Sequence, residues 1–267
     1  MTTSVVAPGL CVVRGGGDLA TGAVWRVTRA GWPVVVCELA HPLTIRRTVA
    51  VSSAVTDGEI DIEGMRAVLA PDADTAAALA REGVVGVVVS PELPALDAHV
   101  VVDARLAKRN IDTTVDDAPL VVGLGPGFTA GLDCHAVVET LRGHRLGRVL
   151  WSGSAAPDTG IPGTIGSRSA ERVLRAPTGG TATWRVAIGD FVEEDDTLGE
   201  IGDRPVTTPF AGVVRGLIHE RVPVTTGLKI GDIDPRPDRT ACFEISDKAL
   251  AIGGGVLEAV LAGARRP

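Results

Sequence analysis

The feature that most constrains the fold is a series of short valine-rich runs separated by alanine-rich stretches. These runs occupy residues 10–13, 33–38, 84–89, 100–102, 120–122 and 149–151. Continuous valine runs without polar alternation are typical of parallel strands covered on both faces. Residues 18–30 follow the first run and place Leu19, Ala23 and Val27 on one helical face. The alternation predicts an α/β fold with a Rossmann-like, mostly parallel sheet in residues 1–170.

Residues 171–240 are expected to form a smaller β-rich module, because strand-like pieces and glycine turns replace the helical stretches. A quasi-repeat with a constant offset of 32 positions relates Pro177 to Pro209, Gly180 to Gly212, Val192 to Val224 and Ile201 to Ile233. Its pattern resembles the half-motif of biotinyl/lipoyl-type barrel-sandwich domains. Carrier versions hold a modifiable lysine at the hairpin between the halves, where this chain has residues 202–205 with no lysine. The resemblance therefore implies the fold without the swinging-arm role.

Residues 241–267 are predicted to be a helical segment that docks on the first domain. Residues 245–264 are read as helical after the glycines 253–255, with an apolar stripe formed by Val256, Leu257, Val260 and Leu261.

Composition excludes several classes of partner. A net charge of −7 and an aromatic share of 3% argue against nucleic-acid binding. No apolar run is long enough for a membrane span, and residues 1–4 do not begin a signal peptide. The scattered cysteines 11, 37, 134 and 242 favour reduced thiols in a cytoplasmic protein, and no metal site is predicted.

A first glycine-rich loop follows the first strand and reads Gly15-x-Gly17-x-x-Ala20, with Glu38 ending the next strand. In a dinucleotide fingerprint such glycines approach the phosphates and the acid binds ribose hydroxyls. We therefore predict a nucleotide or other anion here, with Arg14 and Thr21 among the binding residues. A simple tight turn is the alternative, and Asp18, which would repel a phosphate, has the alternative role of an N-terminal cap.

A second glycine-rich loop spans residues 123–131 and is expected to lead into a helix at residues 132–141. Gly125, Gly127 and Thr129 are predicted to contribute to an anion nest there. The Lys-Ser/Thr of a Walker loop is absent, which excludes ATP hydrolysis of that type. Two such loops at the strand ends suggest one bipartite ligand, or two anionic ligands; two tight turns are the alternative.

Basic residues supply the remaining candidates. Arg46 and Arg47 could clamp a phosphate or carboxylate through bidentate contacts, although an exposed basic face is the commoner outcome. Only three of the 26 basic residues are lysines, and the only asparagine, Asn110, lies beside Lys108. Lysine can lose its proton when it is desolvated, whereas arginine stays charged. The candidate catalytic residues are therefore Lys108, Asn110, Asp18 and Lys248, and Lys229 is a candidate binding residue. Codon bias toward arginine is the alternative explanation of why lysine is scarce.

Seven ordered motifs resemble the YqeB-type family, accessory proteins of selenium-dependent molybdenum hydroxylase systems. They occupy residues 14–22, 42–48, 106–110, 123–131, 158–163, 227–236 and 245–249. The resemblance covers almost the whole chain. It implies a role in maturing or supplying a molybdenum hydroxylase, through a pterin cofactor, and it assigns no catalytic residue.

The leading hypothesis is a cytoplasmic accessory protein that binds a nucleotide or a phosphorylated pterin of the molybdenum-cofactor type across the two glycine loops. A molybdenum hydroxylase is the expected protein partner, and self-association is left open. One alternative is an NAD-dependent oxidoreductase with Glu38 on the ribose, against which stands the absence of tyrosine as a proton donor. The other is a non-catalytic scaffold for a hydroxylase subunit.

Overall fold

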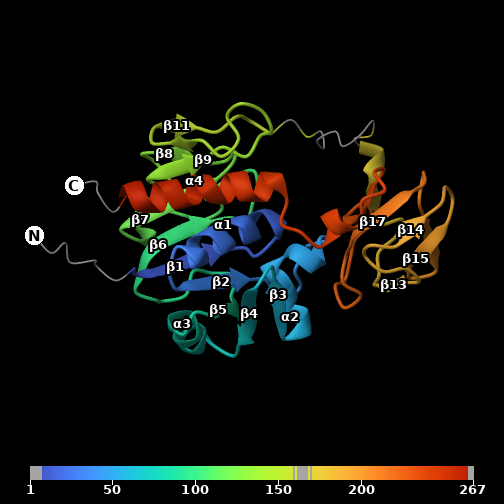
Figure 1. Ribbon diagram of the computed structural model, residues 1–267, viewed down its shortest axis with the longest axis horizontal. Helices are drawn as coiled ribbons and strands as arrows, with labels where there is room; N and C mark the ends of the chain where they lie inside the picture. The colour runs from blue at the N-terminus through green and yellow to red at the C-terminus, as the bar shows by residue number, and fades with distance from the viewer. Residues whose placement is uncertain (1–7, 159, 161–167, 169, 264–267) are drawn as a thin grey trace, which may run out of the picture.

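A computed structural model describes residues 8–158, 160, 168 and 170–263. Residues 1–4, most of the motif at residues 158–163 and the predicted helix end at Ala264 lie outside the described residues. Two regions are distinguishable in Figure 1: a large sheet with its helices, and a group of small sheets beside it.

The large sheet has nine strands in the order β10-β9-β7-β6-β1-β2-β5-β4-β3. Its strands are β1 (Leu10–Arg14), β2 (Val34–Glu38), β3 (Glu59–Ile62), β4 (Met65–Ala70), β5 (Val85–Val89), β6 (Ala98–Asp103), β7 (Leu120–Leu124), β9 (Ala136–Val138) and β10 (Val149–Leu150). The seven central strands are parallel, while β3 and β10 pair antiparallel at the two edges. Valine fills both faces of the central strands, which explains why their sequences show no polar alternation.

Helices cover the two faces unequally. The helical segments are α1 (Asp18–Arg29), α2 (Ala54–Asp57), α3 (Ala73–Arg81) and α4 (Asp247–Gly263), with 3-10 turns η1 (Arg47–Val49), η2 (Val51–Ser53), η3 (Val115–Asp117), η4 (Ala170–Arg172) and η5 (Thr240–Cys242). α1 and α4 share one hydrophobic core with the sheet, and α3 packs in the core on the opposite face. The connections from β6 to β7 and from β7 to β9 contain no α-helix. α4, from the far end of the sequence, lies beside α1 and packs against β7, β9 and β10 in place of such helices.

Glycines allow α1 and α4 to pack closely, side by side in Figure 1. A Cβ added to Gly22 of α1 would lie 2.1 Å from the carbonyl oxygen of Ala249, and one added to Gly253 would lie 2.1 Å from that of Gly22. The glycines 253–255, expected to precede the terminal helix, therefore lie inside α4. They were misread because glycine is a poor helix former on its own, yet here it permits a close helix contact.

The β-rich region forms two small antiparallel sheets around its own core. One contains β12 (Val173–Arg175), β18 (Lys229–Asp234), β17 (Gly212–Leu217) and β14 (Phe191–Val192), and the other β13 (Ala182–Trp184), β15 (Thr197–Ile201) and β16 (Arg204–Thr207). A further two-stranded sheet pairs β8 (Thr129–Ala130) with β11 (Gly153–Ser154).

The predicted fold class, a Rossmann-like sheet joined to a barrel-sandwich module, is wrong. The structure has one large mixed sheet and several separate small antiparallel sheets. Helices do not alternate regularly with strands beyond β6, and the predicted helix at residues 132–141 contains β9 instead. Valine runs identify strands but do not fix their direction or the nature of the connection between them. Val137 and Val138 are each fully buried, on opposite faces of the sheet, which favours a strand over a helix here.

Candidate functional site

A cavity of about 790 Å³ opens at the carboxyl ends of β1, β2, β5 and β6, and we call it the sheet-end cavity. β1 and β6 are neighbours in the sheet. After β1 the chain continues to β2 on one side, and after β6 it continues to β7 on the other side, so the two connections diverge. Loops diverge at such a point and leave a crevice that suits a ligand. Of the predicted residues, the cavity is lined by Arg14, Gly15, Gly17, Asp18, Glu38, Arg46 and Lys229.

The first glycine loop binds the end of β2 to the end of β1. Gly15 has a φ of +92°, a conformation that suits glycine. The Gly16 N–H donates to Oε2 of Glu38 at 2.7 Å, and the Leu39 N–H donates to Oε1 at 2.7 Å. Burial raises the pKa of Glu38, and the two N–H donors partly offset that rise. The carboxylate is thus held by backbone groups at the wall of the cavity.

Asp18 occupies the first turn of α1, where its negative charge complements the helix dipole. Its Oδ2 lies 3.3 Å from Nη1 of Arg46. Arg46 also donates from Nη2 to the carbonyl oxygens of Ala241 and Glu244. Arg46 therefore joins α1 to the segment before α4, and a phosphate at this helix end would meet the Asp18 carboxylate.

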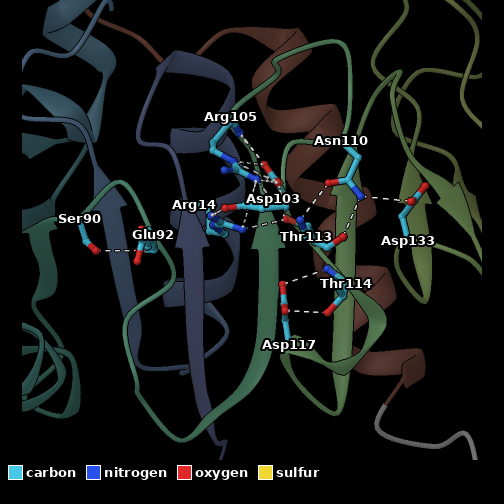
Figure 2. A network of polar contacts seen from close by, with 11 residues as sticks. Arg14, Ser90, Glu92, Asp103, Arg105, Asn110, Thr113, Thr114, Asp117 and Asp133 are labelled. Atoms are coloured by element: carbon cyan, nitrogen blue, oxygen red, sulfur yellow. Dashed lines mark hydrogen bonds and ion pairs between the residues drawn. The ribbon is translucent and has the colours of Figure 1, made fainter.

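A buried polar network fixes the loop after β6 (Figure 2). Asp103, 1% exposed, accepts hydrogen bonds from Arg105 and from the Thr113 hydroxyl at 2.7 Å. Arg14 donates to Asp112 at 2.9 Å and to Thr113 at 3.0 Å. The guanidinium of Arg14 is therefore already neutralised by Asp112. Its contacts with Asp112 and Thr113 support the loop.

Asn110 ties this loop to its neighbours. Its amide nitrogen donates to the Thr113 carbonyl oxygen at 2.7 Å and to Oδ1 of Asp133 at 3.1 Å, and its amide oxygen accepts from the Thr113 N–H at 2.9 Å. Figure 2 shows the side chain between these partners. Lys108 in the same loop has a φ of +62°, which costs energy for a residue with a Cβ. The network holds this strained loop in place.

A second cavity, of about 380 Å³, lies where the large-sheet core meets the core of the small sheets, and we call it the junction cavity. Its wall shares Asp18, Leu19, Ile45, Arg46 and Lys229 with the sheet-end cavity, so the two adjoin. The two regions are held together beside it, because the Leu217 N–H donates to the Ile45 carbonyl oxygen. Its charged lining residues are Asp18, Arg46, Arg142, Asp158, Arg172, Arg215, Lys229, Asp232 and Lys248.

Some of the cations around the junction cavity are matched by carboxylates. Nη2 of Arg172 donates to both oxygens of Asp232 at 2.8 Å. Arg142 makes a bidentate contact with Asp247 at 2.8 and 3.0 Å, and this holds the pKa of Asp247 down at about 2. These pairs are geometrically well formed and leave little net charge for a ligand.

Three other cations at this cavity are poorly neutralised. Arg215 is 8% exposed, and its ion pair with Asp234 is long, at 3.6 Å, while Asp234 is held by Arg236 at 2.7 Å. The Nε of Arg215 has no hydrogen-bond partner among the described residues. Among the residues that the structure describes, neither Lys229 nor Lys248 makes an ion pair, whereas the third lysine, Lys108, does. Burial, with repulsion from Arg142, lowers the pKa of Lys248, and burial with repulsion from Arg46 lowers that of Arg215.

All three lysines are found at or beside the junction cavity. Lys229 and Lys248 line it, and the Lys108 ammonium lies 2.7 Å from Oδ2 of Asp158, which lines it as well. Lys108 is exposed, and its ion pair keeps the pKa of Asp158 below the usual range. Positions 108, 229 and 248, far apart in sequence, are thus gathered at one place.

The remaining predicted site residues lie elsewhere. The Thr21 hydroxyl is buried and bonded to the Gly17 carbonyl oxygen and the Val51 N–H. Arg47 donates to the Leu217 carbonyl oxygen and lines a separate cavity with Trp184 and His219. These contacts give both side chains a structural role.

The second glycine loop is shaped by packing. A Cβ on Gly125 would lie 2.5 Å from Oγ1 of Thr140, and one on Gly127 would lie 2.5 Å from the Arg109 backbone. The Thr129 hydroxyl is 2.9 Å from that of Ser154. None of the three residues lines either cavity, although Pro126 of this loop lines the junction cavity.

Sequence reasoning missed Arg142, Arg172 and Arg215. A signal existed for Arg215, because it is a lone charge in the apolar strand run of β17. Such a residue is costly to bury without a partner. Arg142 and Arg172 lie next to irregular segments, where no periodicity distinguishes a cavity residue from a surface one.

Two further properties concern the described residues only. They contain no cluster of three or more His, Cys, Asp or Glu side chains arranged to hold a metal ion. None of the helices they form combines the length and the apolar character that crossing a bilayer requires.

Fold and cavities define a mixed-sheet protein with a cationic cavity between its two cores. No family model matches the chain. Similar solved structures include an aspartoacylase family protein from Mesorhizobium loti (12% identity, 86% of each chain, TM-score 0.30) and the product-bound ectoine utilization protein EutE (DoeB) from Ruegeria pomeroyi (12%, 85% of each chain, TM-score 0.30). Another is a succinylglutamatedesuccinylase/aspartoacylase from Rhodobacter sphaeroides (14%, 87% of each chain, TM-score 0.25). At these TM-scores the likeness carries no functional argument.

Sequence comparison gives a much stronger relationship. The chain is 48% identical over 255 residues to "Uncharacterized protein YqeB" of Escherichia coli (strain K12). The alignment covers 94% of this chain and 47% of that protein, so the chain spans about half the length of the curated relative it matches. The chain is therefore similar to about half of the YqeB protein, which is consistent with the resemblance that the seven motifs carry.

Proposed function

We propose that this chain binds a phosphorylated small molecule, a nucleotide or a phosphorylated pterin, with its phosphate in the junction cavity. The observation that carries the proposal is the set of poorly neutralised cations Arg215, Lys229 and Lys248 facing one cavity. The chain as a whole has a net charge of −7, so this concentration of positive charge is local.

Energetics supports an anionic ligand. A buried cation without a good partner is costly, and the cost is recovered when an anion arrives. The buried Nε of Arg215 has no partner among the described residues, so the charge of this guanidinium is poorly compensated, and the two ammonium groups can adjust to phosphate oxygens. A phosphate with several oxygens suits such a set better than a single carboxylate does. Asp18 also lines this cavity but is paired with Arg46, so the phosphate is placed against Arg215, Lys229 and Lys248.

Calorimetric titration with inorganic pyrophosphate and with GTP tests the proposal. Saturable binding that weakens with added salt is expected for the folded chain, because exposed charges such as Lys229 are screened. The double variant Lys229→Met/Lys248→Met is expected to bind either probe at least tenfold more weakly. Arg66→Met is the matched control, since Arg66 pairs with Glu59 on an exposed hairpin. Absence of binding by a folded wild-type chain would contradict the proposal.

We propose further that the ligand belongs to a molybdenum hydroxylase system, in which the chain is an accessory protein and the ligand is a pterin of the molybdenum-cofactor type. The seven motifs that resemble the YqeB-type family support this role. Replacing the native gene by the Arg215→Met variant is expected to lower hydroxylase activity in the source cells without lowering the amount of hydroxylase protein. Unchanged activity would argue against the role and leave ligand binding in place.

A further inference from the structure

The sheet-end cavity is large enough to hold a second part of the ligand bound in the junction cavity. Its volume of about 790 Å³ falls in the range of small-molecule sites. It adjoins the junction cavity through Asp18, Leu19, Ile45, Arg46 and Lys229. A ligand with a phosphate in one cavity can therefore extend into the other.

The wall of this cavity suits an uncharged ring. Leu39, Leu43 and Ile111 line it and are 48%, 52% and 55% exposed, so their apolar surface is left open. Apolar walls with a few polar groups are typical of sites for heterocycles. Burying these three side chains against a ring would remove apolar area from water.

Glu38 differs from the other acids of this cavity. Asp112 is paired with Arg14 and Arg105, and Asp18 with Arg46. Glu38 makes no ion pair within the described residues and accepts only the backbone N–H groups of Gly16 and Leu39. A carboxylate has about four acceptor sites, so Glu38 keeps about two for a ligand.

Resting on the proposed function, we infer that the sheet-end cavity takes the ring of the phosphorylated ligand and that Glu38 selects a 2-amino-4-oxo edge. Such an edge, shared by guanine and pterins, presents a ring N–H and an adjacent amino N–H. Two parallel N–H donors match the two oxygens of a carboxylate, and hydrogen bonds to a charged acceptor are strong. Adenine has no such pair of donors.

Titrations with GTP, ITP, ATP and 2′-deoxy-GTP test this inference. ITP lacks only the 2-amino group, so loss of one charge-assisted hydrogen bond is expected to weaken binding about tenfold relative to GTP. 2′-Deoxy-GTP is expected to bind as GTP does. Glu38→Gln should abolish the preference, because an amide offers a single acceptor oxygen. Glu38→Asp, which keeps the charge but shortens the side chain, should reduce the preference and serves if the first variant does not fold.

The outcomes separate this inference from the proposed function. Equal binding of GTP and ITP, or a preference that survives Glu38→Gln in a folded protein, would overturn the inference while phosphate binding stands. Equal binding of GTP and ITP with weaker 2′-deoxy-GTP would assign Glu38 to the ribose instead. Failure of pyrophosphate and all four nucleotides to bind would remove the proposed function and the inference with it.

Discussion

Replacing Arg215 by methionine is expected to weaken phosphate binding without destabilising the protein. Methionine keeps the apolar length of the side chain and removes the guanidinium. A hydrogen bond to a charged group contributes about 1.5–3 kcal/mol, which corresponds to about 10- to 150-fold in affinity. The affinity of Arg215→Met for pyrophosphate should fall within that range.

The free energy of unfolding of Arg215→Met should stay unchanged or rise, although its affinity for phosphate falls. Arg215 is buried, repelled by Arg46 and attached to Asp234 only at 3.6 Å. Asp234 keeps its contacts with Arg236 at 2.7 and 2.9 Å in the variant. Replacing poorly compensated buried charge by an apolar group is often neutral or stabilising by about 1–4 kcal/mol. We expect the ligand-free free energy of unfolding to be unchanged or higher by up to about 2 kcal/mol.

Calorimetric titration and urea unfolding of the same preparation provide the two measurements. Arg66→Met, which removes an exposed ion pair, should change neither by more than about 0.5 kcal/mol. Arg215→Met binding pyrophosphate as tightly as wild type would refute the assignment of this cation to the ligand. A loss of stability above about 2 kcal/mol would refute the view that Arg215 is poorly compensated in the ligand-free protein.

Three further changes test the site and the packing. Burial lowers the pKa of Lys248 below its usual 10.5, so the contribution of Lys248 to the affinity should be lost as pH rises through that lowered pKa. Lys248→Arg should keep its affinity at high pH, because arginine stays charged, and parallel pH profiles of the two proteins in calorimetry would contradict this. Asp103→Ala leaves Arg105 without one of its carboxylates and should cost about 3 kcal/mol in urea unfolding, and a cost under about 1 kcal/mol would show that the network is dispensable. Gly22→Ala should destabilise the protein by about 1–3 kcal/mol, because the added Cβ meets the Ala249 carbonyl. Gly254→Ala, whose added Cβ has nothing within 4 Å, should stabilise α4 by about 0.5–1 kcal/mol, and equal effects of the two variants on the melting temperature would contradict close packing of α1 and α4.

Local sequence located much of the secondary structure but not its assembly. The valine runs predicted the strands that became β1, β2, β5, β6 and β7, because a buried strand needs apolar, β-branched side chains on both faces. They could not show that β3 and β10 pair antiparallel or that α4 replaces the missing crossover helices. Direction and connection depend on contacts between distant segments. The sequence could not place the glycines at 253–255 for the same reason, since Gly253 packs on Gly22, more than two hundred residues away, and Gly255 packs on Gly147.

For some candidate site residues the position could be predicted from the sequence, and for others it depends on the tertiary structure. The first glycine loop and Glu38 were predicted to lie together, because consecutive parallel strands bring their carboxyl ends to one edge, and they do line one cavity. Arg14 and Asn110 belong to the same end of the sheet, but their partners, Asp112, Thr113 and Asp133, occupy them. Charge neutralisation of this kind is decided by loop geometry, which sequence spacing does not fix.

The sequence by itself determined the strands, the first glycine turn, the scarcity of lysine and the family likeness, because these depend on residue types and short spacings. Only the tertiary structure decided that Lys229 and Lys248 face one cavity with Arg215, and that Lys108 pairs with Asp158 at its wall. The physical reason is that Coulomb interactions act through space, so a cationic site arises wherever folding leaves charges together without partners.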